Sequence, residues 1–177
     1  YRGYDSAGVA TLDVNGETHL CRAAGKLVNL RERLAESPCP GSVGVGHTRW
    51  ATHGKVSLEN AHPLTGCFED EVAIVLNGIV ENFRELRDSL EADGHAFGSE
   101  TDAEVVAHLV ERHYEGDLVE AVRAAYDELE GHFAFVVIHH DHPDLLVAGR
   151  HQCPLVVGVG EGEMFLASAT TAFLPET

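Results

Sequence analysis

The segment Gly46-His47-Thr48-Arg49-Trp50-Ala51-Thr52-His53-Gly54 is the most informative stretch of this chain. It combines a permanently charged arginine, a tryptophan, two hydroxyl side chains and two imidazoles, and it follows the apolar residues Val43 to Val45. The interior of a sheet cannot satisfy so many polar groups. We therefore expect a strand to end here and to deliver these side chains to a pocket.

The length and composition of the chain indicate one globular domain over residues 1–177. Hydrophobic residues make up 44% of the sequence, which is ordinary for a domain with a substantial core. No apolar run approaches the roughly 20 residues of a transmembrane helix, and no secretion signal is evident. The chain opens on Tyr1 and on a motif, so we expect a fragment cut at both ends, from a cytoplasmic protein.

The charge is strongly negative. The sequence has 29 acidic and 12 basic residues, a net charge of −17. The electrostatic field of this negative charge repels nucleic acid and anionic membranes, so neither is an expected partner. Adaptation to high salt and an ordinary acidic cytoplasmic enzyme both explain this balance.

The sequence offers no recognisable metal site. The four cysteines show no zinc-binding spacing, and we expect them to be free thiols that mostly serve in packing. His139, His140 and His142 are too close in sequence for a usual site. The cysteines are Cys21, Cys39, Cys67 and Cys153.

The order of predicted elements favours an α+β fold. Turn signals and alternating patterns predict strands over 7–14, up to about 21, 42–49 and 72–76, and four more over 132–139, 144–148, 154–159 and 163–168. Helices are expected from 27 to about 34, from 79 to about 94, from 101 and from 117. Grouped strands and helices with short turns suit antiparallel sheets with helices outside.

Three further polar groups accompany the opening segment: Arg2 to Gly8, Leu76 to Asn82, and Ser99 to Asp102. Arg49 suits a carboxylate ligand, although a lone arginine is more often a surface ion pair. Asn77-Gly78 is expected before a helix, where it forms either an oxyanion hole or a plain turn. Thr101 and Glu104 form a predicted capping box, which places Asp102 in the first turn of a helix.

Taken in order, these motifs and Asn60-Ala61-His62-Pro63-Leu64 resemble the class II glutamine amidotransferase domain, an N-terminal-nucleophile fold with four αββα layers. The resemblance covers the whole chain and is closest to the glutaminase half of the hexosephosphate aminotransferases. Related phosphoribosylpyrophosphate amidotransferases and asparagine synthetases generally lack a tryptophan at the position of Trp50.

The resemblance implies specific roles. Arg49 would bind the α-carboxylate of glutamine and Asp102 its α-ammonium group, while Asn77 and Gly78 would form the oxyanion hole. The loop that covers glutamine would contain Trp50, Thr52 and His53. The family needs no metal or organic cofactor. Its full enzymes aminate fructose 6-phosphate in a second, isomerase domain, through which we expect a homodimer.

The nucleophile of the family is an N-terminal cysteine, which this sequence lacks; a mid-chain cysteine such as Cys21 has no free α-amine to replace it. We therefore expect these residues to bind glutamine without hydrolysing it. Two alternatives remain at this stage: another class II amidotransferase, such as an amidophosphoribosyltransferase, and a non-catalytic glutamine-binding module.

Overall fold

A computed structural model of the chain describes residues 5–51, 53–68 and 71–174. No helix among these residues is long and apolar enough to cross a membrane. The elements in chain order are β1 (Ser6–Leu12), β2 (Thr18–Ala24), α1 (Leu27–Glu36), β3 (Val43–Arg49), β4 (Leu64–Thr65), β5 (Val72–Val80), α2 (Phe83–Ala92), α3 (Glu104–His113), α4 (Leu118–Glu128), β6 (Gly131–His139), β7 (Val147–His151), β8 (Val156–Val159) and β9 (Met164–Ala167).

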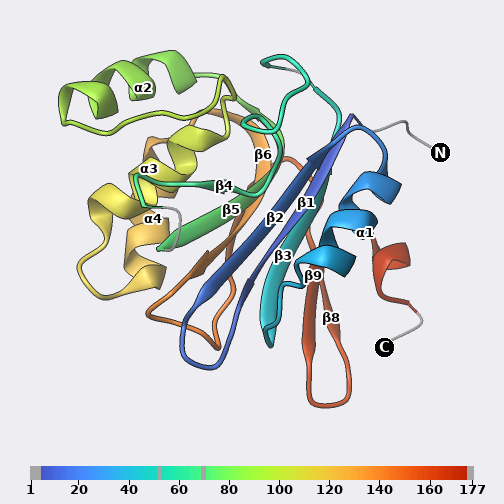
Figure 1. Cartoon of the computed structure of the whole chain (residues 1–177). Helices are drawn as coiled ribbons and strands as arrows, with labels where there is room; N and C mark the ends of the chain where they lie inside the picture. Colours follow the sequence, from blue (N-terminus) through green and yellow to red (C-terminus); the bar gives the residue numbers. More distant parts are fainter. Residues whose placement is uncertain (1–4, 52, 69–70, 175–177) are drawn as a thin grey trace.

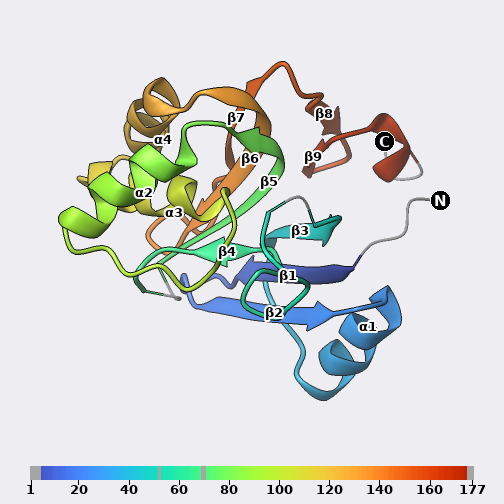
Figure 2. The ribbon, with the colours of Figure 1, turned by 90° about the horizontal axis from the view of Figure 1, so that it is seen from above.

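The strands form two main sheets and one hairpin. The first sheet has the order β2-β1-β3, the second has the order β4-β5-β6-β7, and β8 pairs with β9. Every ladder between these strands is antiparallel. Helix α1 covers the first sheet, and helices α2, α3 and α4 cover the second (Figures 1 and 2). The predicted α+β fold with four αββα layers is confirmed.

Three separate apolar cores hold the four layers together. Because side chains alternate between the faces of a strand, β5 sends Ile74 and Leu76 toward the helices and Val75 toward the first sheet. Strand β6 divides its side chains in the same way, with Phe135 and Val137 toward the helices. Leu30 of α1 packs against the outer face of the first sheet.

The hairpin between β1 and β2 forms at Asn15-Gly16, as predicted. The Asp13 carboxylate accepts hydrogen bonds from the backbone N–H groups of Asn15 at 2.8 Å and Glu17 at 2.9 Å. Gly16 has a φ of +82°, and a Cβ there would lie 2.3 Å from the carbonyl oxygen of His140. Both the backbone angle and the close approach therefore require glycine.

The prediction that Asn77-Gly78 precedes a helix is wrong. Strand β5 continues through both residues to Val80, and α2 begins only at Phe83. Their partners on β6 are Ala134 and Phe133, so cross-strand pairing extends the strand beyond its apolar run. Any oxyanion hole at Asn77 and Gly78 would therefore use a strand, without the partial charge of a helix N-terminus.

The predicted capping box is also wrong. Helix α3 begins at Glu104, and its N-cap residue Ala103 forms no side-chain cap. Glu104 instead accepts hydrogen bonds from the backbone N–H groups of Gly98 at 2.7 Å and Ser99 at 2.8 Å. Asp102 consequently lies before the helix, not in its first turn. The predicted cap of α4 is confirmed, because Asp117 accepts from the N–H groups of Val119 and Glu120.

Candidate functional site

A cavity of about 780 Å³ opens between the two main sheets at one end of the sandwich. Residues from the end of β3, from β5 and from the segment before α3 line it. Six of the seven predicted site residues are in this lining: Arg49, Trp50, His53, Asn77, Gly78 and Asp102. The seventh, Thr52, lies outside the described residues. The tertiary structure thus gathers residues from three distant parts of the sequence at one pocket.

Arg49 is buried at the last position of β3 and holds the loop that follows. Its guanidinium donates hydrogen bonds to the backbone carbonyls of His53, of Gly54 at 3.3 Å and of Lys55 at 3.4 Å. The Asp5 carboxylate lies 3.9 Å from the guanidinium and also accepts from the backbone N–H of Ala51. Arg49 therefore shapes the loop in addition to facing the cavity.

Asp102 is buried and fixed in orientation. Its Oδ2 accepts a hydrogen bond of 2.8 Å from the backbone N–H of Val80 in β5. Its Oδ1 lies 3.5 Å from Nδ1 of His53, whose ring packs edge-on against Phe83 at a centroid distance of 5.2 Å. One carboxylate oxygen is thus anchored to the sheet, and the other remains for a cationic group.

Asn77 and Gly78 face the cavity from β5. Asn77 follows Val75 by two residues, so its side chain lies on the face toward the first sheet. Gly78 has a φ of +121°, and a Cβ there would lie 2.0 Å from the carbonyl oxygen of His132. The backbone at this point therefore accepts only glycine, directly after Asn77 in the strand.

Two histidines of the lining received no role from the sequence: His62, which is buried, and His47, which is half-buried. Their rings face each other with a tilt of 35° and with their centroids 4.5 Å apart. Burial, with the nearby Arg49 charge, lowers the pKa of His47 from 6.5 to about 4, and burial lowers the pKa of His62 well below 6.5. Both rings are therefore neutral at pH 7. Their membership of the recognised motifs was the only signal that could have indicated them.

Comparison with known proteins identifies the family of this domain. The family model described as "Glutamine amidotransferase domain" matches residues 47–175. The chain belongs to this family. The matched range includes every predicted site residue.

Curated relatives agree with this assignment. The chain is 53% identical to the glutamine–fructose-6-phosphate aminotransferase [isomerizing] of Thermosynechococcus vestitus, over 100% of the chain and 29% of that protein. It is 55% identical to the enzyme of the same name from Mesorhizobium japonicum, again over 100% of the chain and 29% of the relative. The chain therefore spans less than a third of the length of these relatives.

Two solved structures share the fold. The glutamine phosphoribosylpyrophosphate amidotransferase from B. subtilis superposes with a TM-score of 0.81 at 27% identity, over 97% of this chain and 37% of that chain. A structure described as the allosteric regulatory enzyme of purine biosynthesis gives a TM-score of 0.83 at 26% identity, with the same coverage. The N-terminal-nucleophile amidotransferase fold is thereby confirmed.

Proposed function

We propose that the cavity between the sheets binds glutamine, with Arg49 at the α-carboxylate and Asp102 at the α-ammonium group. The observation that carries this proposal is the convergence of one buried cation and one buried anion on the same cavity. A zwitterionic amino acid needs both charges. A guanidinium has more N–H donors than its three contacts to the loop use, so Arg49 can hold the loop and a carboxylate together.

Asn77 and Gly78 would stabilise the oxyanion formed when the side-chain amide of glutamine is attacked. The Asn77 amide and the Gly78 backbone N–H are adjacent donors on one strand. No cysteine is among the described residues that line the cavity. The family resemblance assigns the attack to an N-terminal cysteine, so the chain as given should bind glutamine without hydrolysing it.

For the longer protein we propose glutaminase activity that supplies ammonia for the amination of fructose 6-phosphate. Support comes from relatives at about 50% identity that are named for this reaction. An amidophosphoribosyltransferase is the weaker alternative, because its structural relatives are only 26–27% identical. A non-catalytic glutamine-binding module would use the same cavity. Cytoplasmic location, absence of cofactors and homodimerisation stay predictions.

Calorimetric titration with L-glutamine and two truncated analogues tests the binding mode. Glutaramate lacks the α-ammonium group, and 4-aminobutanamide lacks the α-carboxylate. The wild-type chain should bind glutamine more tightly than either analogue. Asp102→Asn should bind glutamine and glutaramate almost equally, and Arg49→Lys should lose most of its preference for glutamine over 4-aminobutanamide. Asp141→Asn, on an exposed turn, is the control.

The affinities that each variant loses for glutamine and the two analogues decide whether the proposed binding mode is right. If Asp102→Asn weakens binding of glutamine and glutaramate by the same factor, Asp102 does not bind the ammonium group. If wild-type chain binds none of the three ligands, the proposal is wrong for this chain. If glutamine does bind, activity assays of a longer protein distinguish the three candidate functions. Amination of fructose 6-phosphate indicates the aminotransferase, amination of phosphoribosylpyrophosphate indicates the amidophosphoribosyltransferase, and no activity with either acceptor indicates the binding module.

A further inference from the structure

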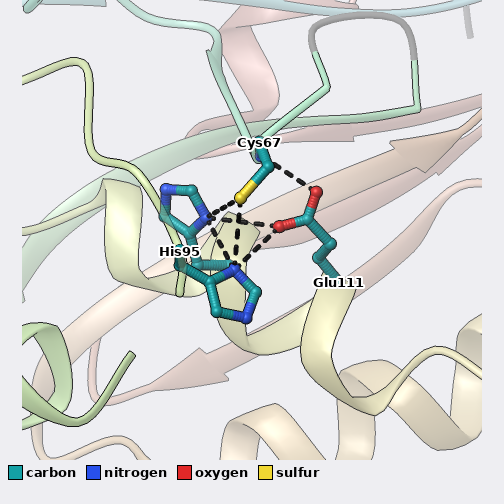
Figure 3. Close-up of side chains that lie close together, drawn as sticks. Cys67, His95 and Glu111 are labelled. Carbon is teal, nitrogen blue, oxygen red and sulfur yellow. Dashed lines mark hydrogen bonds and ion pairs between the residues drawn. The ribbon is translucent and has the colours of Figure 1, made fainter. Parts of the chain in front are cut away.

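Four side chains with metal-binding chemistry converge at a place that the glutamine cavity does not include. They are Cys67, which follows β4, His95, which follows α2, and His108 and Glu111 of α3. None of the four lines the cavity. Figure 3 shows the Cys67 sulfur, the His95 ring and the Glu111 carboxylate directed toward a common point.

Five of the six distances between the four candidate ligand atoms lie between 3.0 and 3.7 Å, and all four atoms lie within 4.8 Å of one another. Sγ of Cys67 lies 3.4 Å from Nδ1 of His95 and 3.7 Å from Nδ1 of His108. The two Nδ1 atoms are 3.3 Å apart, and Oε2 of Glu111 lies 3.0 Å and 3.3 Å from them. Tetrahedral zinc, with bonds of about 2.0–2.3 Å, separates its ligand atoms by roughly 3.3–3.6 Å.

We propose that Cys67 Sγ, His95 Nδ1, His108 Nδ1 and Glu111 Oε2 together bind one Zn²⁺ ion. Thiolate, imidazole and carboxylate are all zinc ligands, and a thiolate favours zinc over magnesium or calcium. One thiolate and one carboxylate also neutralise the charge of a divalent ion. No zinc-binding spacing is visible in the sequence because the four ligands come from three separate segments of the chain.

Further contacts, beyond those among the four ligand atoms, hold the ligand side chains in place. The other carboxylate oxygen of Glu111 accepts a hydrogen bond of 2.9 Å from the backbone N–H of Cys67, which leaves Oε2 for the ion. Nε2 of His108 lies 3.6 Å from Oε1 of Glu104, as metal-binding histidines commonly place the second ring nitrogen near a carboxylate. The backbone N–H groups of Gly98 and Ser99 fix Glu104 in turn.

The surroundings leave room for this arrangement. A Cβ at Gly66 would lie 2.8 Å from Oε1 of Glu111, so glycine lets the carboxylate approach the loop. Cys67 is exposed, which gives an ion a path to the cluster.

The ion would be structural. Four protein ligands complete a tetrahedral shell and leave no position for substrate, unlike a catalytic zinc with an open site. The ion would join the loop after β4, the segment after α2 and helix α3. Since binding to the folded state alone adds to stability, zinc should raise the melting temperature.

The test measures metal content and cobalt spectra of the purified chain. After zinc loading and dialysis, elemental analysis should find about one zinc per chain. Cobalt loading should give the visible bands of tetrahedral Co²⁺ and a thiolate-to-cobalt charge-transfer band. Cys67→Ser should abolish the charge-transfer band and zinc retention, whereas Cys153→Ser, at a cysteine outside the cluster, should keep both. Glu104→Gln should weaken zinc binding by about 10–100-fold.

Either of two results would overturn the proposal. The first is that the wild-type chain retains no zinc and shows no tetrahedral cobalt spectrum. The second is that the Cys67→Ser variant retains zinc and the charge-transfer band as the wild type does. Circular dichroism of each variant, together with the zinc-dependent rise in melting temperature, separates loss of the ion from loss of the fold.

Discussion

Nδ1 of His53 lies 3.5 Å from Oδ1 of Asp102, and this contact joins the loop after β3 to the wall of the cavity. The other oxygen of Asp102 is held by the backbone of β5. A ligand cation at Asp102 would therefore meet the loop as well as the sheet. The conformation of the loop and the occupancy of the cavity should be coupled through this pair.

Tryptophan fluorescence can report this coupling. Trp50 is the only tryptophan in the sequence, and its side chain lines the cavity while 66% exposed. Saturating glutamine should shift its emission to shorter wavelength, because the covered indole loses contact with water. Asp102→Asn should remove most of the shift. An unchanged spectrum at a glutamine concentration that saturates in calorimetry would show that Trp50 does not cover the ligand.

Arg49→Lys should destabilise the ligand-free domain. A lysine cannot donate to the carbonyls of residues 53–55 together, and the loss of a hydrogen bond from a charged donor costs about 1.5–3 kcal/mol in free energy of unfolding. Urea unfolding measures the difference. Arg123→Lys is the control, since its ion pair with Glu120 is exposed and the change should be below about 0.5 kcal/mol. Equal losses in both variants would contradict the loop-holding role of Arg49.

Gly78→Ala and Gly94→Ala form a matched pair. Both glycines have positive φ, +121° and +98°, but only at Gly78 would a Cβ meet backbone, 2.0 Å from the His132 carbonyl oxygen; at Gly94 it meets nothing within 4 Å. Gly94→Ala should lower the free energy of unfolding by about 1 kcal/mol, because alanine is disfavoured at positive φ. Gly78→Ala should lower the free energy of unfolding, measured by chemical denaturation, several-fold more than Gly94→Ala does. Similar losses of stability in the two variants would refute the steric argument.

Asn77→Ala tests the oxyanion hole in a longer chain that carries the N-terminal cysteine. Loss of one oxyanion donor typically raises the barrier by about 3 kcal/mol, so glutaminase kcat should fall by roughly 100-fold. The KM for glutamine should change little, because the donor acts on the transition state. A wild-type kcat would rule out this role for Asn77.

Stability should fall as the pH decreases below about 6.5, in part because of His47. The folded pKa of His47 is lowered to about 4, so between pH 6.5 and pH 4 the unfolded chain binds more protons than the folded chain. The free energy of unfolding therefore rises with pH in this window, by an amount on the order of 3 kcal/mol for this group. His47→Gln should flatten the slope. Because His62 and His139 act in the same direction, the measurement is the difference in slope between variant and wild type.

Sequence patterns located most of the secondary structure because the signals are local. Asn15-Gly16 and Asp117 act through their own neighbouring backbone groups, so the hairpin and the cap of α4 were predictable. The end of β5 was not, because Asn77 and Gly78 are held in the strand by pairing with β6, more than fifty residues away in sequence. The start of α3 was missed for a different, local reason: two sets of backbone N–H groups compete for Glu104, and it bonds to those of Gly98 and Ser99 instead of completing a cap with Thr101.

The sequence by itself determined the family and, through the resemblance to that family, the four layers and six of the residues that line the cavity between the sheets. The motifs that carry the resemblance are short and contiguous, so they can be read without the fold. Only the tertiary structure decided that Arg49 also holds the loop, that Asp102 is fixed by Val80, and that Cys67, His95, His108 and Glu111 meet. The contact of Asp102 with Val80 and the meeting of the four ligand residues join segments that are distant in the chain, so chain folding alone brings these polar atoms together. The Arg49 contacts are local, but their acceptors are backbone carbonyls, which every residue carries and which no residue type marks in the sequence.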